Sequence, residues 1–177
     1  AVGLTEIGAA RFLPSGQALP YKISFENPPT ASAIPGSIEV ISRLDAQLDA
    51  RTFRLGDIKI GDIQVHIPEG RATFQGDFDF TRSKGFILRV TAGVDVERSI
   101  ASWLFEAIDP LTGEVIRDTT KGLLAPNNAL GIGQGTVGYT ILPRTDALTG
   151  DAIAANARVL FNTAAPQDAP QITQTLD

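Results

Sequence analysis

The 177-residue sequence contains no cysteine, no methionine and a single histidine. Without cysteine, the chain cannot form disulfides, use a thiol nucleophile or bind metal through thiolates. A chain of this length buries a core large enough to fold without such cross-links, so we expect one principal domain. The chain begins at Ala1 and lacks methionine, and we therefore interpret it as a processed or excised segment of a longer polypeptide.

Clustered positive charge and long apolar runs are also missing. The formal net charge is -5, and the 15 Lys and Arg residues are spread thinly along the chain. Nucleic acid and anionic lipid both require clustered positive charge, so neither is an expected partner. No apolar run approaches the roughly 20 residues that span a bilayer, so we expect no membrane insertion.

The clearest pattern in the sequence is an alternation of apolar and polar residues between Arg71 and Val96. It covers 71–80 and 86–96, with a polar turn ending at Gly85 between them. A period of two is typical of half-buried strands, so the segment predicts an antiparallel hairpin. A second sheet must cover its apolar face. That face includes Phe74, Phe78, Phe80, Phe86 and Leu88.

Similar patterns predict strands along most of the chain. Asp45 to Arg51 is expected to form a loop or a single helical turn, and Gly56-Asp57 and Gly61-Asp62 to bend the chain around two short strands. Seven or more strands, frequent turns and no long helix predict an all-β fold, an antiparallel β-sandwich. The other predicted strands are 18–26, 37–44, 100–109, 136–142 and 152–161.

The sandwich domain is expected to span residues 18–163, with different segments on either side. Residues 1–17 form an N-terminal lead-in that fits either a short helix or an edge strand. Residues 164–177 hold few large apolar residues and two prolines, which predicts an extended linker to a following domain.

Two features invite a cofactor or catalytic interpretation. Gly133–Gly138 matches G-x-G-x-x-G, but a dinucleotide site needs a strand before this motif and a helix after it. Here a strand follows, so we interpret the glycines as loop and close-packing residues. His66 would have to serve any Ser-His-Asp relay or His-based zinc site, and no G-x-S-x-G occurs. We expect a solvated histidine at a strand end, no enzyme and no cofactor.

Acidic residues gather at three places in the sequence. Asp77 and Asp79 are expected to form a solubilising edge beside Arg71. Calcium takes six to eight oxygen ligands, usually several from one loop, and the 109–118 turn could bring carboxylates and carbonyls together. Calcium is therefore a possible ligand there, with ordinary turn chemistry as the alternative. The calcium candidates are Asp109, Glu114 and Asp118, and the third place is Asp57 with Asp62.

Two enzymatic alternatives use carboxylates. A glycosidase needs two of them across a cleft lined with sugar-stacking aromatics, yet the chain has one Trp and two Tyr. The Asp109-Pro110 bond suggests calcium-dependent self-cleavage, as in some bacterial secreted proteins. A proline placed in a turn is the simpler interpretation.

Three stretches together resemble the immunoglobulin-like repeat domains of very large bacterial secreted and surface proteins. They are Leu19–Asn27 with Leu44-Asp45 and Leu48-Asp49; Ile108–Gly113 with Gly122–Asn127; and Gly135–Ile141 with Leu148–Gly150 and Asn156–Phe161.

The resemblance implies an immunoglobulin-like fold and a non-catalytic stalk or spacer module outside the cell. The implied partners are neighbouring domains of the same polypeptide, and a surface glycan or protein is the alternative. Such domains often occur in proteins that also carry calcium-binding repeats.

Overall fold

The structure is a computed structural model that describes residues 2–4, 12–13, 17–147, 150, 152–164, 167–168 and 172–176. Within these residues it contains strands and one helical turn, α1 (Thr81–Lys84). The strands are β1 (Val2–Leu4), β2 (Phe12–Leu13), β3 (Leu19–Glu26), β4 (Ser37–Arg43), β5 (Leu48–Ile60), β6 (Ile63–Val65), β7 (Phe74–Phe80), β8 (Phe86–Asp95), β9 (Ile100–Ile108), β10 (Gln134–Pro143), β11 (Ala152–Ala155), β12 (Arg158–Phe161), β13 (Gln167–Asp168) and β14 (Ile172–Leu176).

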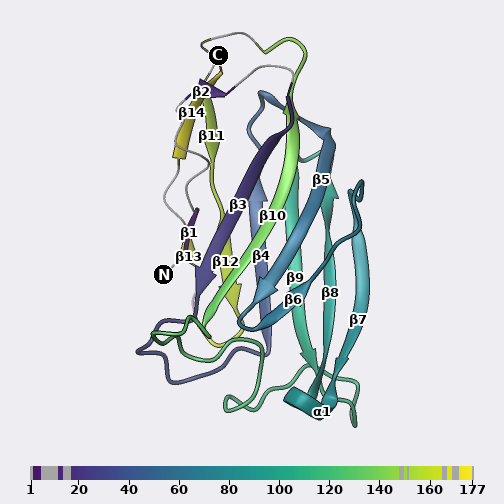
Figure 1. The fold of residues 1–177 in the computed structure, drawn as a ribbon, viewed down its shortest axis with the longest axis vertical. Helices are drawn as coiled ribbons and strands as arrows, with labels where there is room; N and C mark the ends of the chain where they lie inside the picture. The colour runs from purple at the N-terminus through teal and green to yellow at the C-terminus, as the bar shows by residue number, and fades with distance from the viewer. Residues whose placement is uncertain are drawn as a thin grey trace.

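Two main sheets form the molecule (Figure 1). One has the strand order β1-β3-β10-β5-β6, and the other has the order β13-β12-β4-β9-β8-β7. A small third sheet has the order β11-β14-β2. The described strands pair antiparallel except for β14 with β2, which are parallel. The predicted all-β antiparallel sandwich is confirmed.

The core lies between the two main sheets, because alternate residues of each strand point inward. Strand β9 shows this most clearly: Ala101, Trp103, Phe105 and Ala107 have no exposed surface. Aromatic rings join the sheets, since Trp103 of β9 lies 6.1 Å from Phe53 of β5 and 5.8 Å from a β10 tyrosine, measured between ring centroids. Apolar burial between the layers is the main force that holds the sandwich together.

The predicted hairpin is present as β7 and β8. Its register is continuous from Phe74 opposite Ala92 to Phe80 opposite Phe86. The connecting turn is α1, which ends at Gly85 with φ of 81°, a conformation that favours glycine. The two strands differ in burial, because β8 lies inside the sheet whereas β7 is its edge and its phenylalanines are half-buried.

Two predictions around β5 were wrong. The segment expected as a loop belongs to β5 from Leu48 onward, and Gly56-Asp57 lies within that strand instead of bending the chain. Opposite it, Val137 and Tyr139 of β10 pair with Ile58 and Leu55, so β5 carries an extra residue there. This is a β-bulge, which absorbs the Gly-Asp pair without ending the strand. The second bend is confirmed at Gly61, where φ is 59°.

The described parts of both ends are paired into sheets. Strand β1 pairs with β3, which answers the open question for residues 2–4 in favour of an edge strand. In the tail, β13 pairs with β12, and β14 lies between β11 and β2. This pairing differs from the extended linker that composition predicts, because backbone hydrogen bonds form there despite the scarcity of large apolar side chains. Division of the chain at residues 17 and 163 stays a prediction.

The central layer gives a direct test of the fold. Replacing Phe105, which is fully buried, with alanine should cost about 3–5 kcal/mol by leaving a cavity. At this chain length that lowers the melting temperature by about 10 °C. The matched control is Leu111→Ala, since Leu111 is 93% exposed and should melt within about 1 °C of the parent. Equal melting of the two variants would contradict the assignment of β9 to the core.

Removal of residues 165–177 tests the role of the tail. Because β14 completes the small sheet and β13 covers β12, we expect the truncated chain to lose at least about 2 kcal/mol and to melt about 4–8 °C lower. Thermal melting followed by circular dichroism measures this. A change within about 1 °C would favour the linker expected from composition.

Candidate functional site

The 109–118 turn uses its carboxylates for local hydrogen bonds. Asp109 Oδ1 accepts the Leu111 backbone N–H at 2.9 Å. Asp118 Oδ1 accepts both the backbone N–H (2.9 Å) and the hydroxyl (2.7 Å) of Thr120. These bonds from Thr120 hold the pKa of the Asp118 carboxyl below its usual value. Both carboxylates therefore stabilise the bends in which they lie.

Further backbone bonds close the first of these bends. The Asp109 N–H donates to the Glu114 carbonyl and the Gly113 N–H donates to the Asp109 carbonyl, both at 2.8 Å. Throughout the described residues, no group of three or more His, Cys, Asp or Glu side chains is arranged to hold a metal ion. The structure thus does not bring Asp109, Glu114 and Asp118 together as one ligand set, and calcium binding there stays a prediction.

Melting with and without calcium tests that prediction. A site that binds only the folded chain would add about 2.7 kcal/mol at a hundred times its dissociation constant, a rise of about 5–11 °C. We expect less than 2 °C between chelator and tens of millimolar calcium at matched ionic strength, because the carboxylates already accept local bonds. A rise of 5 °C or more that Asp118→Asn abolishes would identify a calcium site.

His66 lies immediately after β6 and its side chain is 77% exposed, in agreement with a solvated strand-end histidine. Its Nδ1 lies 2.8 Å from Asp57 Oδ1, and that oxygen also accepts the Ile67 N–H at 3.1 Å. The two side chains line a hollow of about 320 Å³ together with Thr136. Asp57 therefore anchors the loop after β6 to the bulge in β5.

Two other acids pair with cations that sequence spacing does not reveal. Asp62 Oδ1 lies 2.7 Å from Lys84 Nζ, which joins the β5–β6 turn to α1 across the sandwich. Asp77 lies on the exposed face of β7, as expected, and forms a two-pronged contact with Arg89 of β8, at 3.0 and 3.2 Å. In each pair the hydrogen bond from the cation lowers the carboxyl pKa. These pairs become visible only with the strand register.

The glycine motif at 133–138 begins in a loop and continues into β10, as its sequence predicts. A Cβ on Gly135 would overlap the ring of Phe25, and one on Gly133 would lie 2.5 Å from the Asn127 backbone. A strand and not a helix follows the loop, so the close-packing interpretation holds for these residues.

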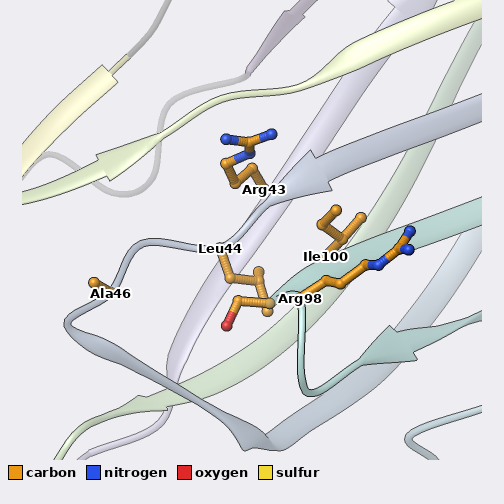
Figure 2. A pocket seen from close by; sticks show the side chains of 6 residues that line it. Arg43, Leu44, Ala46, Arg98 and Ile100 are labelled. Carbon is orange, nitrogen blue, oxygen red and sulfur yellow. The ribbon is translucent and has the colours of Figure 1, made fainter.

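The hollow in Figure 2 has a volume of about 410 Å³ and lies where β4 ends and β9 begins. Buried Leu44 and half-buried Ile100 provide its apolar part. Arg43 and Arg98 extend from it in different directions (Figure 2). Small-molecule sites orient their ligands with converging polar groups. The diverging guanidinium groups make this hollow a poor small-molecule site.

The aromatic residues that commonly stack on sugars are in the core. Trp103, Tyr21 and Tyr139 are at most 5% exposed, and they account for every Trp and Tyr in the chain. Burial raises the pKa of Tyr139 to about 12, and that of Tyr21 is raised further, so both phenols are neutral at ordinary pH. Neither residue type offers a stacking platform on the surface.

Comparison with known proteins gives similarity in structure and not in sequence. No family model matches the chain, and no curated protein matches it either. Domains D2 and D3 of the major pilin SpaD from Corynebacterium diphtheriae match with a TM-score of 0.53 and 12% identity, over 98% of this chain and 51% of that one. The fold is an immunoglobulin-like β-sandwich.

Two further solved structures are similar to this chain in fold. The full-length SpaD pilin matches with a TM-score of 0.54 and 13% identity, over 98% of this chain and 35% of that one. A collagen-binding domain from a Staphylococcus aureus adhesin matches with a TM-score of 0.46 and 11% identity, over 99% and 95%. The chain thus spans about half and about a third of the two pilin structures.

Proposed function

We propose that this chain is a non-catalytic structural or adhesive module, a stalk or spacer unit, of a larger bacterial extracellular protein. The observation that carries the proposal is the sandwich itself: its Trp and Tyr residues and most of its large apolar residues are used for the core. The acidic residues that could supply chemistry are engaged in turns or in exposed ion pairs. The similarity in fold to pilin domains supports the same role.

The positions of the terminal strands bear on how neighbouring domains of a longer polypeptide would attach. Strands β1 and β14 lie on the same flank of the sandwich, and β14 lies nearer its upper end (Figure 1). A stalk unit joined end to end is expected to have its ends at opposite poles of the sandwich, and the position of these two strands on one flank does not itself support that arrangement. Among the described residues, no helix is long and apolar enough to cross a membrane.

A binding module is the first alternative. Burial of Trp and Tyr disfavours a glycan ligand, because sugar recognition relies on exposed aromatic faces. A protein ligand fits the surface better, since half-buried phenylalanines lie along β7. Calcium-dependent self-cleavage is the second alternative. The Asp109 carboxylate that would attack the chain already accepts the Leu111 N–H.

Tandem copies test the spacer role. One, two and three copies placed between two fluorescent proteins should increase the maximum dimension, measured by small-angle X-ray scattering, by a constant step. Strands of 8–13 residues and a rise of about 3.3 Å per residue give a step of about 26–43 Å. The control is a Gly/Ser linker of equal residue number, whose dimension grows less than linearly.

Three results would contradict the proposal. If the second and third copies did not increase the maximum dimension, the modules would be folding back on one another. Saturable binding to a glycan array at micromolar concentration would favour the binding module. Two bands on a denaturing gel after incubation with calcium, with a cut between Asp109 and Pro110, would favour self-cleavage.

A further inference from the structure

Strand β7 is a long free edge at the end of the six-stranded sheet. The six-stranded sheet ends at β7, which lies at the margin of the molecule in Figure 1. It has seven residues, whereas the other sheet-edge strands, β1, β6, β13, β11 and β2, have two to four. A free edge exposes backbone N–H and C=O groups that can pair with another strand. The outermost strands at the other sheet ends are short, which limits this hazard there, but β7 is not shortened.

The usual protections against edge pairing are also missing from β7. Its sequence, FQGDFDF, has no proline, and its pairing with β8 has no bulge. Its charges are on the exposed face, and both already have partners within the same chain. Asp77 contacts Arg89 on β8, and Asp79 Oδ1 accepts the Thr81 N–H at 2.9 Å. Charges that point inward or toward the edge would block an incoming strand, whereas Asp77 and Asp79 lie on the exposed face.

The inner face of β7 favours an apolar partner. Phe74, Phe78 and Phe80 are half-buried, so each ring packs on the core and keeps part of its surface in solvent. The rings of Phe74 and Phe78 are 6.2 Å apart and nearly parallel, and they lie over Gly76, which has no side chain. Another strand alongside β7 would cover these rings and satisfy the free backbone groups together.

We propose that β7 is a self-association edge, at which a second copy of this chain adds its own β7 in antiparallel register centred on Gly76. In this register Phe74 lies opposite Phe78 of the second copy, and Gln75 lies opposite Asp77 of the second copy. Each pair occurs twice by symmetry. Facing aromatic pairs and an amide opposite a carboxylate are both favourable across antiparallel strands.

The charges select this register over its neighbours. Centring on Asp77 places that residue opposite itself, and centring on Phe78 places Asp77 opposite Asp79, so both oppose like charges. Centring on Gln75 overlaps only three residues of each β7, against five for Gly76. A register centred between two residues, and not on one, would place the phenylalanines of the two copies on opposite faces of the joined sheet.

The size of the edge sets the strength of the contact. Five paired residues extend about 17 Å, and such an interface is smaller than the roughly 1,000 Å² of a stable complex. We therefore expect a dissociation constant on the order of 0.1–1 mM for the isolated chain. Chains held side by side in an assembly would associate more strongly, because tethering raises their effective concentration. This inference goes beyond the spacer role, which requires no self-association.

Charge variants at the exposed residue Gln75 test the register. Gln75→Lys places a cation opposite Asp77 in both symmetric pairs and should lower the dissociation constant about two- to thirty-fold. Gln75→Glu should raise it by a similar factor. Thr140→Lys and Thr140→Glu make the same charge changes at an exposed position on β10 and should leave it unchanged. Sedimentation equilibrium from about 10 µM to 1 mM measures all five chains, with thermal melts to confirm folding.

Cysteine cross-linking gives a second, independent readout, because the natural chain has no cysteine. A mixture of Gln75→Cys and Asp77→Cys chains should form a disulfide-linked heterodimer under mild oxidation, and should do so faster than either variant alone. Each variant alone forms a disulfide-linked homodimer only if its cysteine lies opposite the same cysteine of the second copy. The Gln75→Cys homodimer therefore reports the register centred on residue 75, and the Asp77→Cys homodimer the register centred on residue 77.

Two outcomes overturn the proposal. One is a parent chain that stays monomeric up to about 1 mM, together with cysteine variants that show no preference for the heterodimer. This result would overturn the proposal even if the edge bound a strand of some other protein. The other is association that responds equally to the Gln75 and Thr140 variants, because net charge alone would then control it. Loss of self-association would leave the spacer role untouched, since the tandem-copy measurement does not depend on it.

Discussion

The aromatic contact between the two main sheets is the interaction on which the structure depends. Trp103 from one sheet packs on Phe53 and Tyr139 from the other, and Tyr139 in turn stacks on Tyr21 at 5.1 Å. These rings come from β9, β5, β10 and β3, each of which is an inner strand of its sheet. Large rings at the centre give the layers their spacing, and smaller aliphatic side chains fill the space around them.

The use of aromatics in the core has a consequence for the surface. A chain with 7% aromatic residues that places its Trp, both Tyr and four of its nine Phe in the core has fewer aromatic rings to offer for recognition. Its surface is instead made of short-range polar contacts, such as Asp49 with Arg51 and Asp77 with Arg89. Exposed ion pairs of this kind add little to stability, typically 0–1 kcal/mol each.

Local patterns were enough to predict the fold but not the pairing of side chains. Alternation identified the hairpin and most inner strands, because burial on one face leaves a period of two in the sequence. It failed at Gly56-Asp57, where a bulge keeps the strand running through residues that usually mark a turn. The tail shows a different limit: β14 pairs with two neighbours through backbone bonds, and such bonds leave little trace in composition.

The candidate site residues show the same limit. Spacing grouped Asp57 with Asp62, but the two are held by partners that come from elsewhere in the chain, His66 and Lys84. Which cation meets which carboxylate depends on register and on how the turns stack at each end of the sandwich. That information is spread over the whole chain, and no short motif contains it.

The parallel pairing of β14 with β2 has a mechanical meaning. Tension that pulls β2 back toward its start and β14 forward toward its end acts along the strands, in opposite directions. The two strands pair at Thr175 with Phe12 and at Leu176 with Leu13. The hydrogen bonds between them are then loaded in shear and must break together. An antiparallel pair pulled from one end opens like a zipper, one bond at a time, at lower force.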